Sequence, residues 1–256
     1  MKLLAGTSGY AFKEWKGSFY PNDLKDDGML GFYASKFPAV EINNTFYRLP
    51  KEHVLLDWAA QVPETFTFAI KASQRITHHA RLKPECAGAV EFLLKNTSAL
   101  ASRLGPILFQ LPPNLKKDFD RLRVFLATLP AERRYTIEFR HESWFGDDVF
   151  DALRERDIAL CVSEQPEFAS PVVATATWGY ARLHRFDYDD TALAEWARRI
   201  AAQSWSEAYV FFKHDEGAGS GPPAVESFAR AVALCRPARS EGPARAEHRC
   251  DGSAPS

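Results

Sequence analysis

The stretch Tyr135–Arg140, with the sequence YTIEFR, decides the fold class because its apolar and polar side chains alternate. Successive residues of a strand point to opposite faces, so Ile137 and Phe139 share one face and Glu138 and Arg140 share the other. In a barrel, one strand face packs on helices and the other points into the interior. The stretch therefore predicts a barrel strand whose interior face is polar.

Similar short apolar runs recur along the chain, with helical patterns between most of them. For example, Leu193, Trp196, Ala197 and Ile200 have the spacing of one helix face. Strands that alternate with helices predict a parallel sheet with right-handed crossovers, and eight such units close into a barrel. The eight expected strands are Lys2–Ala5, Ala39–Asn43, Phe66–Lys71, Pro106–Leu111, Tyr135–Arg140, Ile158–Val162, Gly179–His184 and Ala208–Lys213.

The predicted architecture is a single α/β domain, a (β/α)8 TIM-like barrel over residues 1–235. The segment SEQPEFASPVVATAT, residues 163–177, has no helical pattern, so we expect the barrel to be irregular around the sixth strand. Another helix is expected to include Leu93 and Leu104 and to end at Gly105 as its C-cap. Residues 236–256 are rich in Pro, Gly, Ser and charge, which predicts a disordered C-terminal tail.

Composition limits the function classes. The chain has 256 residues and a net charge of −1, so no global field attracts nucleic acid or membrane, and an anion site must be a local patch. Its four cysteines have no metal-ligand or CxxC spacing. No apolar stretch approaches the roughly 20 residues that span a bilayer. We therefore expect a cytoplasmic protein with no membrane partner.

The charged side chains on the inward face gather mainly at the C-terminal ends of the strands, where barrel enzymes carry their chemistry. Cations outnumber carboxylates in this set, which predicts an anionic or polyhydroxyl ligand, because phosphate and carboxylate match arginine. For Glu138 and Arg182, which lie deeper, the alternative is a buried ion-pair network that merely fills the barrel. The inward charges are Glu41, Glu138, Lys71, Arg140, Arg182 and Lys213.

We assign predicted roles to ten of these side chains and their neighbours. Glu41 or Glu138 is expected to act as a base, with His184 as a proton carrier near neutral pH. The residues expected to bind the ligand are Asn43, Tyr47, Lys71, Gln110, Arg140, Arg182 and Lys213.

A metal site is an alternative that the neighbouring cations disfavour. Glu138, Glu164, His184 and His214 are carboxylate and imidazole ligands placed at strand ends, as in metal-dependent barrels such as xylose isomerase and endonuclease IV. The adjacent arginines and Lys213 would repel a divalent cation. We therefore expect no metal and no cofactor.

Two other functions stay open at this stage. A nucleic-acid-binding or endonuclease IV-like barrel would use the basic segment Arg75–Arg81 and the aromatic rings of Phe46 and Tyr47. A non-catalytic ligand-binding barrel would use the same pocket without a reaction. A small anionic or sugar-like ligand is favoured over nucleic acid, and the oligomeric state is not determined by the sequence.

The same segments carry a family resemblance over roughly residues 1–235. The motifs are GTSGYAFKEWKGSFYP, EINNTFYRLP, FAIKASQRITH, GPILFQLPP, IEFRHESW and YARLH. The chain resembles the YecE-like family, also named domain of unknown function 72, which implies a TIM-like barrel and no established reaction. Many members carry a segment such as FNN after the eighth strand, whereas this chain has FFKHDEGAGSGPP, so no role of that strand is transferred.

Overall fold

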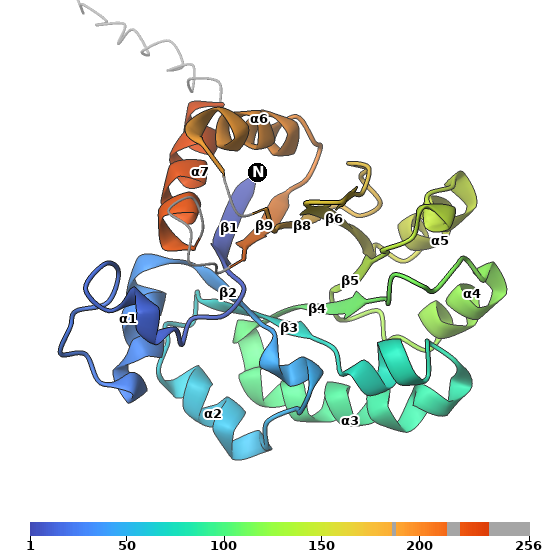
Figure 1. Ribbon diagram of the computed structural model, residues 1–256. Helices are drawn as coiled ribbons and strands as arrows, with labels where there is room; N and C mark the ends of the chain where they lie inside the picture. The colour runs from blue at the N-terminus through green and yellow to red at the C-terminus, as the bar shows by residue number, and fades with distance from the viewer. Residues whose placement is uncertain (186–187, 214–220, 236–256) are drawn as a thin grey trace, which may run out of the picture.

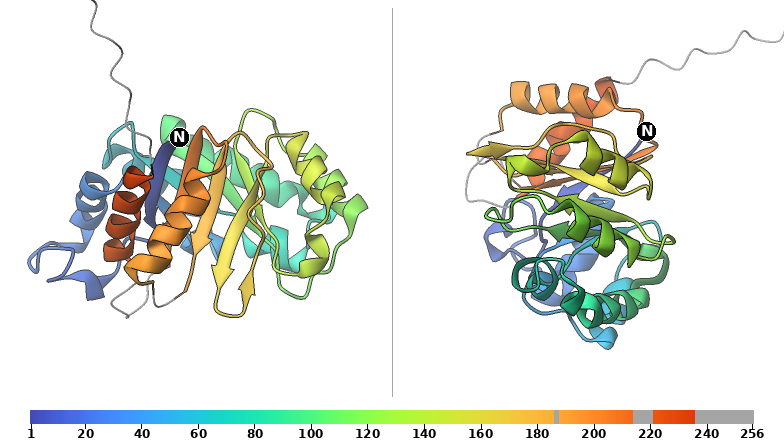
Figure 2. Two further views of the ribbon diagram at one scale, coloured as in Figure 1. Left: turned by 90° about the horizontal axis from the view of Figure 1, so that it is seen from above. Right: turned by 90° about the vertical axis from the view of Figure 1, so that its right-hand side faces the viewer.

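A computed structural model describes residues 1–185, 188–213 and 221–235 (Figure 1). In this part of the chain, eight parallel strands follow the order β1-β9-β8-β6-β5-β4-β3-β2 around a nearly closed barrel, and the short β7 pairs antiparallel with β6. Figures 1 and 2 show the helices arranged around the outside of the strands.

The elements alternate along the chain as the sequence pattern predicts. Their bounds are β1 (Lys2–Thr7), α1 (Met29–Lys36), β2 (Ala39–Ile42), α2 (Glu52–Ala60), β3 (Thr67–Lys71), α3 (Ala87–Thr97), β4 (Leu104–Gln110), α4 (Phe119–Ala127), β5 (Tyr135–Glu138), α5 (Asp147–Arg154), β6 (Ala159–Gln165), β7 (Phe168–Ala169), β8 (Gly179–Leu183), α6 (Asp190–Ala201), β9 (Glu207–Phe212) and α7 (Pro222–Leu234).

All eight predicted strands are confirmed, and so is the irregularity after the sixth. β6 continues to Gln165, turns into β7, and the chain then reaches β8 with no helix in residues 170–178. The predicted helix end at Gly105 is wrong, because α3 ends at Thr97 and Gly105 lies in β4. A side chain at Gly105 would collide with Thr67 of the neighbouring β3, so close strand packing explains this glycine.

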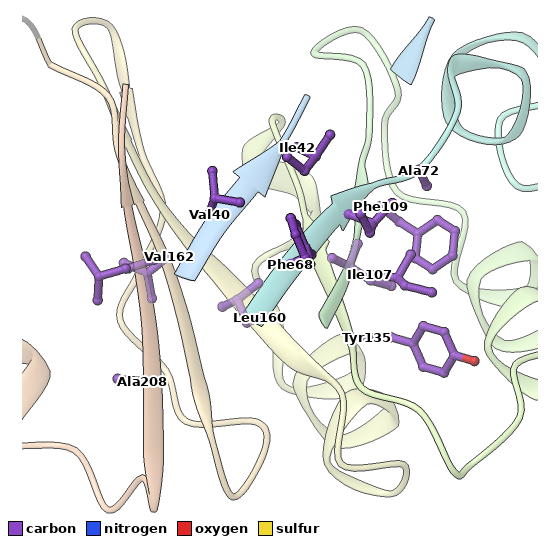
Figure 3. Packing of buried hydrophobic residues seen from close by; sticks show 14 of the residues in the cluster. Val40, Ile42, Phe68, Ala72, Ile107, Phe109, Tyr135, Leu160, Val162 and Ala208 are labelled. Carbon is purple, nitrogen blue, oxygen red and sulfur yellow. The ribbon is translucent and has the colours of Figure 1, made fainter. Parts of the chain in front are cut away.

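The outward face of the strands forms the larger core. Phe109, Ile107 and Tyr135 point from β4 and β5 toward the helices, as Figure 3 shows, and each is almost completely buried. No helix in the described ranges is long and apolar enough to cross a lipid bilayer. Residues 236–256, where a tail is predicted, lie outside the described residues.

The inward face changes from apolar to polar along the barrel axis. A second buried cluster fills the end near the start of the strands, and Tyr180 packs there on Phe211 with ring centroids 5.3 Å apart. Two residues further along β8, the inward side chain is Arg182. The apolar cluster therefore closes one end of the barrel, and the polar residues occupy the other.

The barrel closes between β1 and β2 through a tyrosine hydroxyl. Only Ser8 and Glu41 form a backbone bridge between the described parts of these strands. Instead, the hydroxyl of Tyr33 accepts a hydrogen bond from the Thr7 N–H at 2.8 Å and donates one to the Ala39 carbonyl at 3.2 Å. A tyrosine from α1 thus replaces backbone pairing at the seam.

Replacing Tyr33 with phenylalanine should lower the free energy of unfolding by about 1–3 kcal/mol, because the buried Thr7 N–H loses its partner. Urea denaturation measures this change. The matched control is Tyr47→Phe, whose ring is 74% exposed and which should change stability by less than about 0.5 kcal/mol. Equal stability of the Tyr33→Phe variant and the parent protein would contradict the proposed closure.

Candidate functional site

A guanidinium held by two carboxylates forms the centre of the barrel. Arg182 Nε lies 3.0 Å from Glu41 Oε2, and its Nη1 lies 2.6 Å from Glu138 Oε2. Both carboxylate side chains are 0% exposed, and that of Arg182 is 4% exposed. A buried arginine of this kind is stable only when its charge is paired and its N–H groups are bonded.

Neutral donors complete the bonding of both carboxylates. Glu138 accepts two hydrogen bonds of 3.0 Å from the amide of Gln110, and further bonds from Ser163 and Gln165. Tyr180 donates to Glu41 Oε2 at 2.6 Å. Because the partners come from different strands, the network links β2, β4, β5, β6 and β8.

Ser8 and Asn43 connect this network to the rim of the barrel. The Ser8 hydroxyl donates to Glu41 Oε1 at 2.7 Å, and its Oγ lies 3.1 Å from Nε2 of His184. The Asn43 amide donates to the same Glu41 oxygen at 3.1 Å. Asn43 Oδ1 is buried and has no hydrogen-bond partner among the described residues, so it can accept a hydrogen bond from a ligand.

The charges in this network shift the pKa values of its members. Burial alone would raise the pKa of Glu41, but the guanidinium of Arg182, together with hydrogen bonds from Tyr180 and Ser8, lowers it to about 2. The two carboxylates outweigh the effect of burial on Arg182 and hold its pKa well above the ordinary value. Both groups are therefore charged at neutral pH.

A cavity of about 530 Å³ opens directly above the network. Every barrel strand contributes one residue near its C-terminal end, and Arg182, Phe12 and Pro166 complete the lining. This volume suits a small molecule. The strand contributions, in chain order, are Ser8, Asn43, Lys71, Gln110, Arg140, Gln165, His184 and Lys213.

The lining is cationic. Lys71, Arg140, Arg182 and Lys213 all face the cavity, whereas no carboxylate among the described residues lines it. Burial lowers the pKa of Lys71, and the nearby Arg182 lowers it further, so that it falls to about 8 despite the opposing effect of Glu41 and Glu138. The positive excess predicted from the inward face is therefore present in the cavity itself.

The structure brings most of the predicted site residues together. Asn43, Lys71, Gln110, Arg140, Arg182, His184 and Lys213 line the cavity. Glu41 and Glu138 lie beneath it, fully buried and bonded on both oxygens. Their catalytic roles stay predictions. With a pKa of about 2, Glu41 is a weak base. Both carboxylates are bonded to Arg182 and hold its guanidinium in place.

Tyr47 is the exception among the predicted ligand-binding residues. Its ring is 74% exposed and lies outside the cationic cavity. It lines an adjoining, more apolar cavity of about 390 Å³ that shares Ser8, Phe12 and Asn43 with the cationic one. The residue follows the short helical turn Asn44–Phe46 as its C-cap, in the loop after β2.

His184 differs from the expectation of a proton carrier near neutral pH. Burial lowers its pKa well below the usual 6.5, and the charge of Arg182 acts in the same direction. The imidazole is therefore neutral at pH 7. With Ser8 donating to Glu41, Nε2 of His184 donates to Ser8 Oγ, which leaves Nδ1 as an acceptor.

The ligand set of the alternative metal site does not converge. Glu164 lies on the outward face of β6, where it accepts hydrogen bonds of 2.6 Å from Tyr188 and 2.8 Å from Trp196. Glu138, in contrast, points inward to Arg182. No group of three or more His, Cys, Asp or Glu side chains in the described residues is arranged to hold a metal ion, and His214 lies outside them.

Sequence reasoning missed four lining residues, namely Ser8, Phe12, Gln165 and Pro166. The alternation rule would have found Ser8 and Gln165 if the first and sixth strands had been extended by a few residues. Phe12 and Pro166 lie in loops, for which the sequence contains no comparable signal.

Comparison with known proteins agrees with this architecture. A family model described as "Protein of unknown function DUF72" matches residues 4–247. The chain belongs to the DUF72 family. This confirms the family resemblance noted in the sequence.

Two curated relatives of this DUF72 protein are bacterial. UPF0759 protein YecE of Escherichia coli strain K12 is 39% identical over 115 residues, which cover 44% of this chain and 42% of YecE. The match thus spans about two fifths of the length of YecE. UPF0759 protein YunF of Bacillus subtilis strain 168 is 26% identical over 215 residues, which cover 78% of this chain and 75% of YunF.

Solved structures of DUF72 proteins share the barrel. The crystal structure of a DUF72 family protein from Thermotoga maritima superposes with a TM-score of 0.79 at 25% identity, covering 91% of this chain and 100% of that chain. A DUF72 family protein from Enterococcus faecalis has a TM-score of 0.77 at 16% identity, which supports the fold alone. These names state no reaction, so the function must be argued from the cavity.

Replacing Glu41 with glutamine should lower the free energy of unfolding at pH 7 by about 3–5 kcal/mol, because part of the buried charge of Arg182 is left unpaired. Urea denaturation measures the loss. The control is Glu195→Gln, which removes an exposed pair with Arg198 and should cost less than about 1 kcal/mol. Similar losses in both variants would contradict the central role of the network.

The stability difference between the parent protein and Glu41→Gln should also depend on pH. The pKa of Glu41 is lower in the folded protein than its ordinary value of 4.5, so its contribution to stability is present above about pH 4.5 and is lost as the pH falls toward 2. The stability difference between the parent protein and Glu41→Gln should therefore narrow over this range. A difference that is constant with pH would show that the charge of Glu41 is not its source.

The imidazole of His184 should show no protonation between pH 8 and pH 6, because its lowered pKa keeps it neutral. Nitrogen-15 NMR of the histidine side chains, with the signal assigned by His184→Gln, measures this. A titration midpoint of His184 within that range would contradict the assignment of a neutral ring.

Proposed function

We propose that this protein binds a small ligand that carries a phosphate or carboxylate group together with hydroxyl groups. The observation that carries the proposal is the lining of the cavity, where four cationic side chains face the interior and no carboxylate in the described residues does. Arginine matches phosphate and carboxylate through paired N–H donors, and lysine adds a further positive charge.

Arg140 is the side chain best suited to hold the anionic group. It follows β5 at the rim and is partly buried, and its Nη2 donates to Gln165 Oε1 at 3.2 Å, which orients the guanidinium. Gln165 in turn donates to Glu138. Arg140 is therefore positioned by the buried network without being neutralised by it.

Arg182 forms the floor of the proposed site. Its three nitrogen atoms are each bonded to Glu41 or Glu138, but a guanidinium has five N–H donors. One N–H on each of Nη1 and Nη2 thus remains for a ligand. The network fixes this guanidinium before binding, which reduces the entropy lost when the ligand binds.

The neutral groups of the lining favour a hydroxylated ligand. Asn43 Oδ1 is a buried acceptor without a partner among the described residues, and a ligand hydroxyl would satisfy it. Gln110 lines the same cavity. If the ligand also has an apolar part, that part could contact Phe12 and, in the adjoining cavity, Tyr47.

Replacing Arg140 with alanine should weaken the binding of sulfate about tenfold to a hundredfold, because a charge-assisted hydrogen bond of about 1.5–3 kcal/mol is lost. Calorimetric titration of the purified protein with sulfate measures this. Sulfate is chosen because its charge does not change between pH 6 and 9.

The control for this experiment is Arg75→Ala, because Arg75 is an exposed arginine outside the cavity. This variant should bind sulfate as the parent protein does, and both variants should unfold at the same urea concentration as the parent. Equal weakening by both substitutions, or no binding of sulfate by the parent protein, would overturn the proposed anion site.

A further inference from the structure

Lys71 occupies an unusual place in the cavity. It is the last residue of β3 and is partly buried, and its ammonium lies 4.4 Å from the centre of the Phe46 ring. Its side chain makes no hydrogen bond or ion pair with another described residue. The two carboxylates that act electrostatically on Lys71, Glu41 and Glu138, are already bonded to Arg182.

Burial and neighbouring charge disfavour the charged form of Lys71, whereas the face of the Phe46 ring favours it. The charged groups that act on it are Arg182, Arg140, Glu41 and Glu138, and Lys71 also interacts electrostatically with the titratable rings of His78 and His184. Burial lowers its pKa first, and the two arginines add to this, so that the pKa falls from 10.5 to about 8. About a tenth of Lys71 is then an uncharged amine at pH 7, and roughly half at pH 8. An uncharged amine is a nucleophile.

We propose that Lys71 is a catalytic amine that forms a Schiff base with the aldehyde or ketone carbon of an anionic hydroxycarbonyl ligand. This step rests on the proposed function, because the anionic group must be held by Arg140 and its neighbours. The open-chain forms of phosphorylated or carboxylated sugars belong to this chemical class.

The step is balanced without any additional reactant. The lone pair of Nζ attacks the carbonyl carbon, and the carbonyl oxygen takes up a proton as the nitrogen loses one, which gives a carbinolamine. Protonation of its hydroxyl group and loss of water then leave a C=N double bond to Lys71. The imine that retains a proton on nitrogen is a cation, and it withdraws electrons from the adjacent carbon of the ligand.

The lining of the cavity supports this chemistry at three points. Phe46 shields one side of the amine, which limits competition from water. Arg140 and Arg182 disfavour the protonated, positively charged form of Lys71 before the ligand binds. Asn43 and Gln110, which line the same cavity, can bond the hydroxyl of the carbinolamine.

Reductive trapping tests the proposal. The full chain is incubated with glycolaldehyde phosphate and sodium cyanoborohydride, which reduces an imine to a stable secondary amine, and the modified lysines are identified by peptide mass spectrometry. The rate of modification of Lys71 should be at least about tenfold higher than that of Lys36. Lys36 is a matched reference because it also lies over an aromatic ring, 5.5 Å from the centre of Phe32, but is exposed to solvent.

The pH dependence gives a second measurement. The rate at Lys71 should rise with pH and level off above about pH 8, as the amine becomes fully deprotonated. Lys71→Arg keeps the positive charge and should lose the fast modification completely, and its urea denaturation midpoint reports whether the fold is retained. If Lys71 is modified at the same rate as Lys36 in a protein that still binds sulfate, the proposal that Lys71 is a catalytic amine is contradicted. The proposed anion site is then retained.

The anion site and the amine can fail separately. Uncharged glycolaldehyde should react with Lys71 more slowly than its phosphate ester, and Arg140→Ala should remove this preference while Lys71 still reacts faster than Lys36. Fast modification of Lys71 without any preference for the phosphate ester would support the amine and contradict the anion site.

Discussion

The pairing of one buried arginine with two buried carboxylates is the constraint on which the rest of the site depends. Arg182 can stay charged inside the barrel only because Glu41 and Glu138 bond it on opposite sides. These two carboxylates in turn use the remaining donors of neighbouring strands, including Gln110 and Tyr180. The polar layer is thus one network, in which each member satisfies the next.

This network divides the barrel interior into two regions of different chemistry. Below it, apolar side chains such as Tyr180 and Phe211 exclude water and fill the cylinder. Above it, the cavity has cationic walls because the carboxylates are engaged in the floor and are not exposed to the ligand. The pKa of Lys71 is lowered first by its burial in this cavity and then by Arg182, which remains a full positive charge close to it.

Most of the fold could be predicted from the sequence because strand alternation is a local property. YTIEFR and YARLH each place apolar residues on one face and charged residues on the other, and the structure confirms both faces. The exceptions have tertiary causes. Gly105 was mistaken for a helix end because the approach of Thr67 on a neighbouring strand has no sequence signal. Tyr47 lies outside the cationic cavity because it belongs to the loop after β2, where strand alternation no longer applies.

The sequence by itself determined which side chains share the interior of the barrel, because residues two apart on a strand must point the same way. Only the tertiary structure decided which of them pair with one another and which face a ligand. Pairing depends on strand register and on distances between strands far apart in the chain, such as the 141 residues between Glu41 and Arg182. The neutral state of His184 and the lowered pKa of Lys71 follow from this pairing, because burial and neighbouring charge arise only when the barrel has closed.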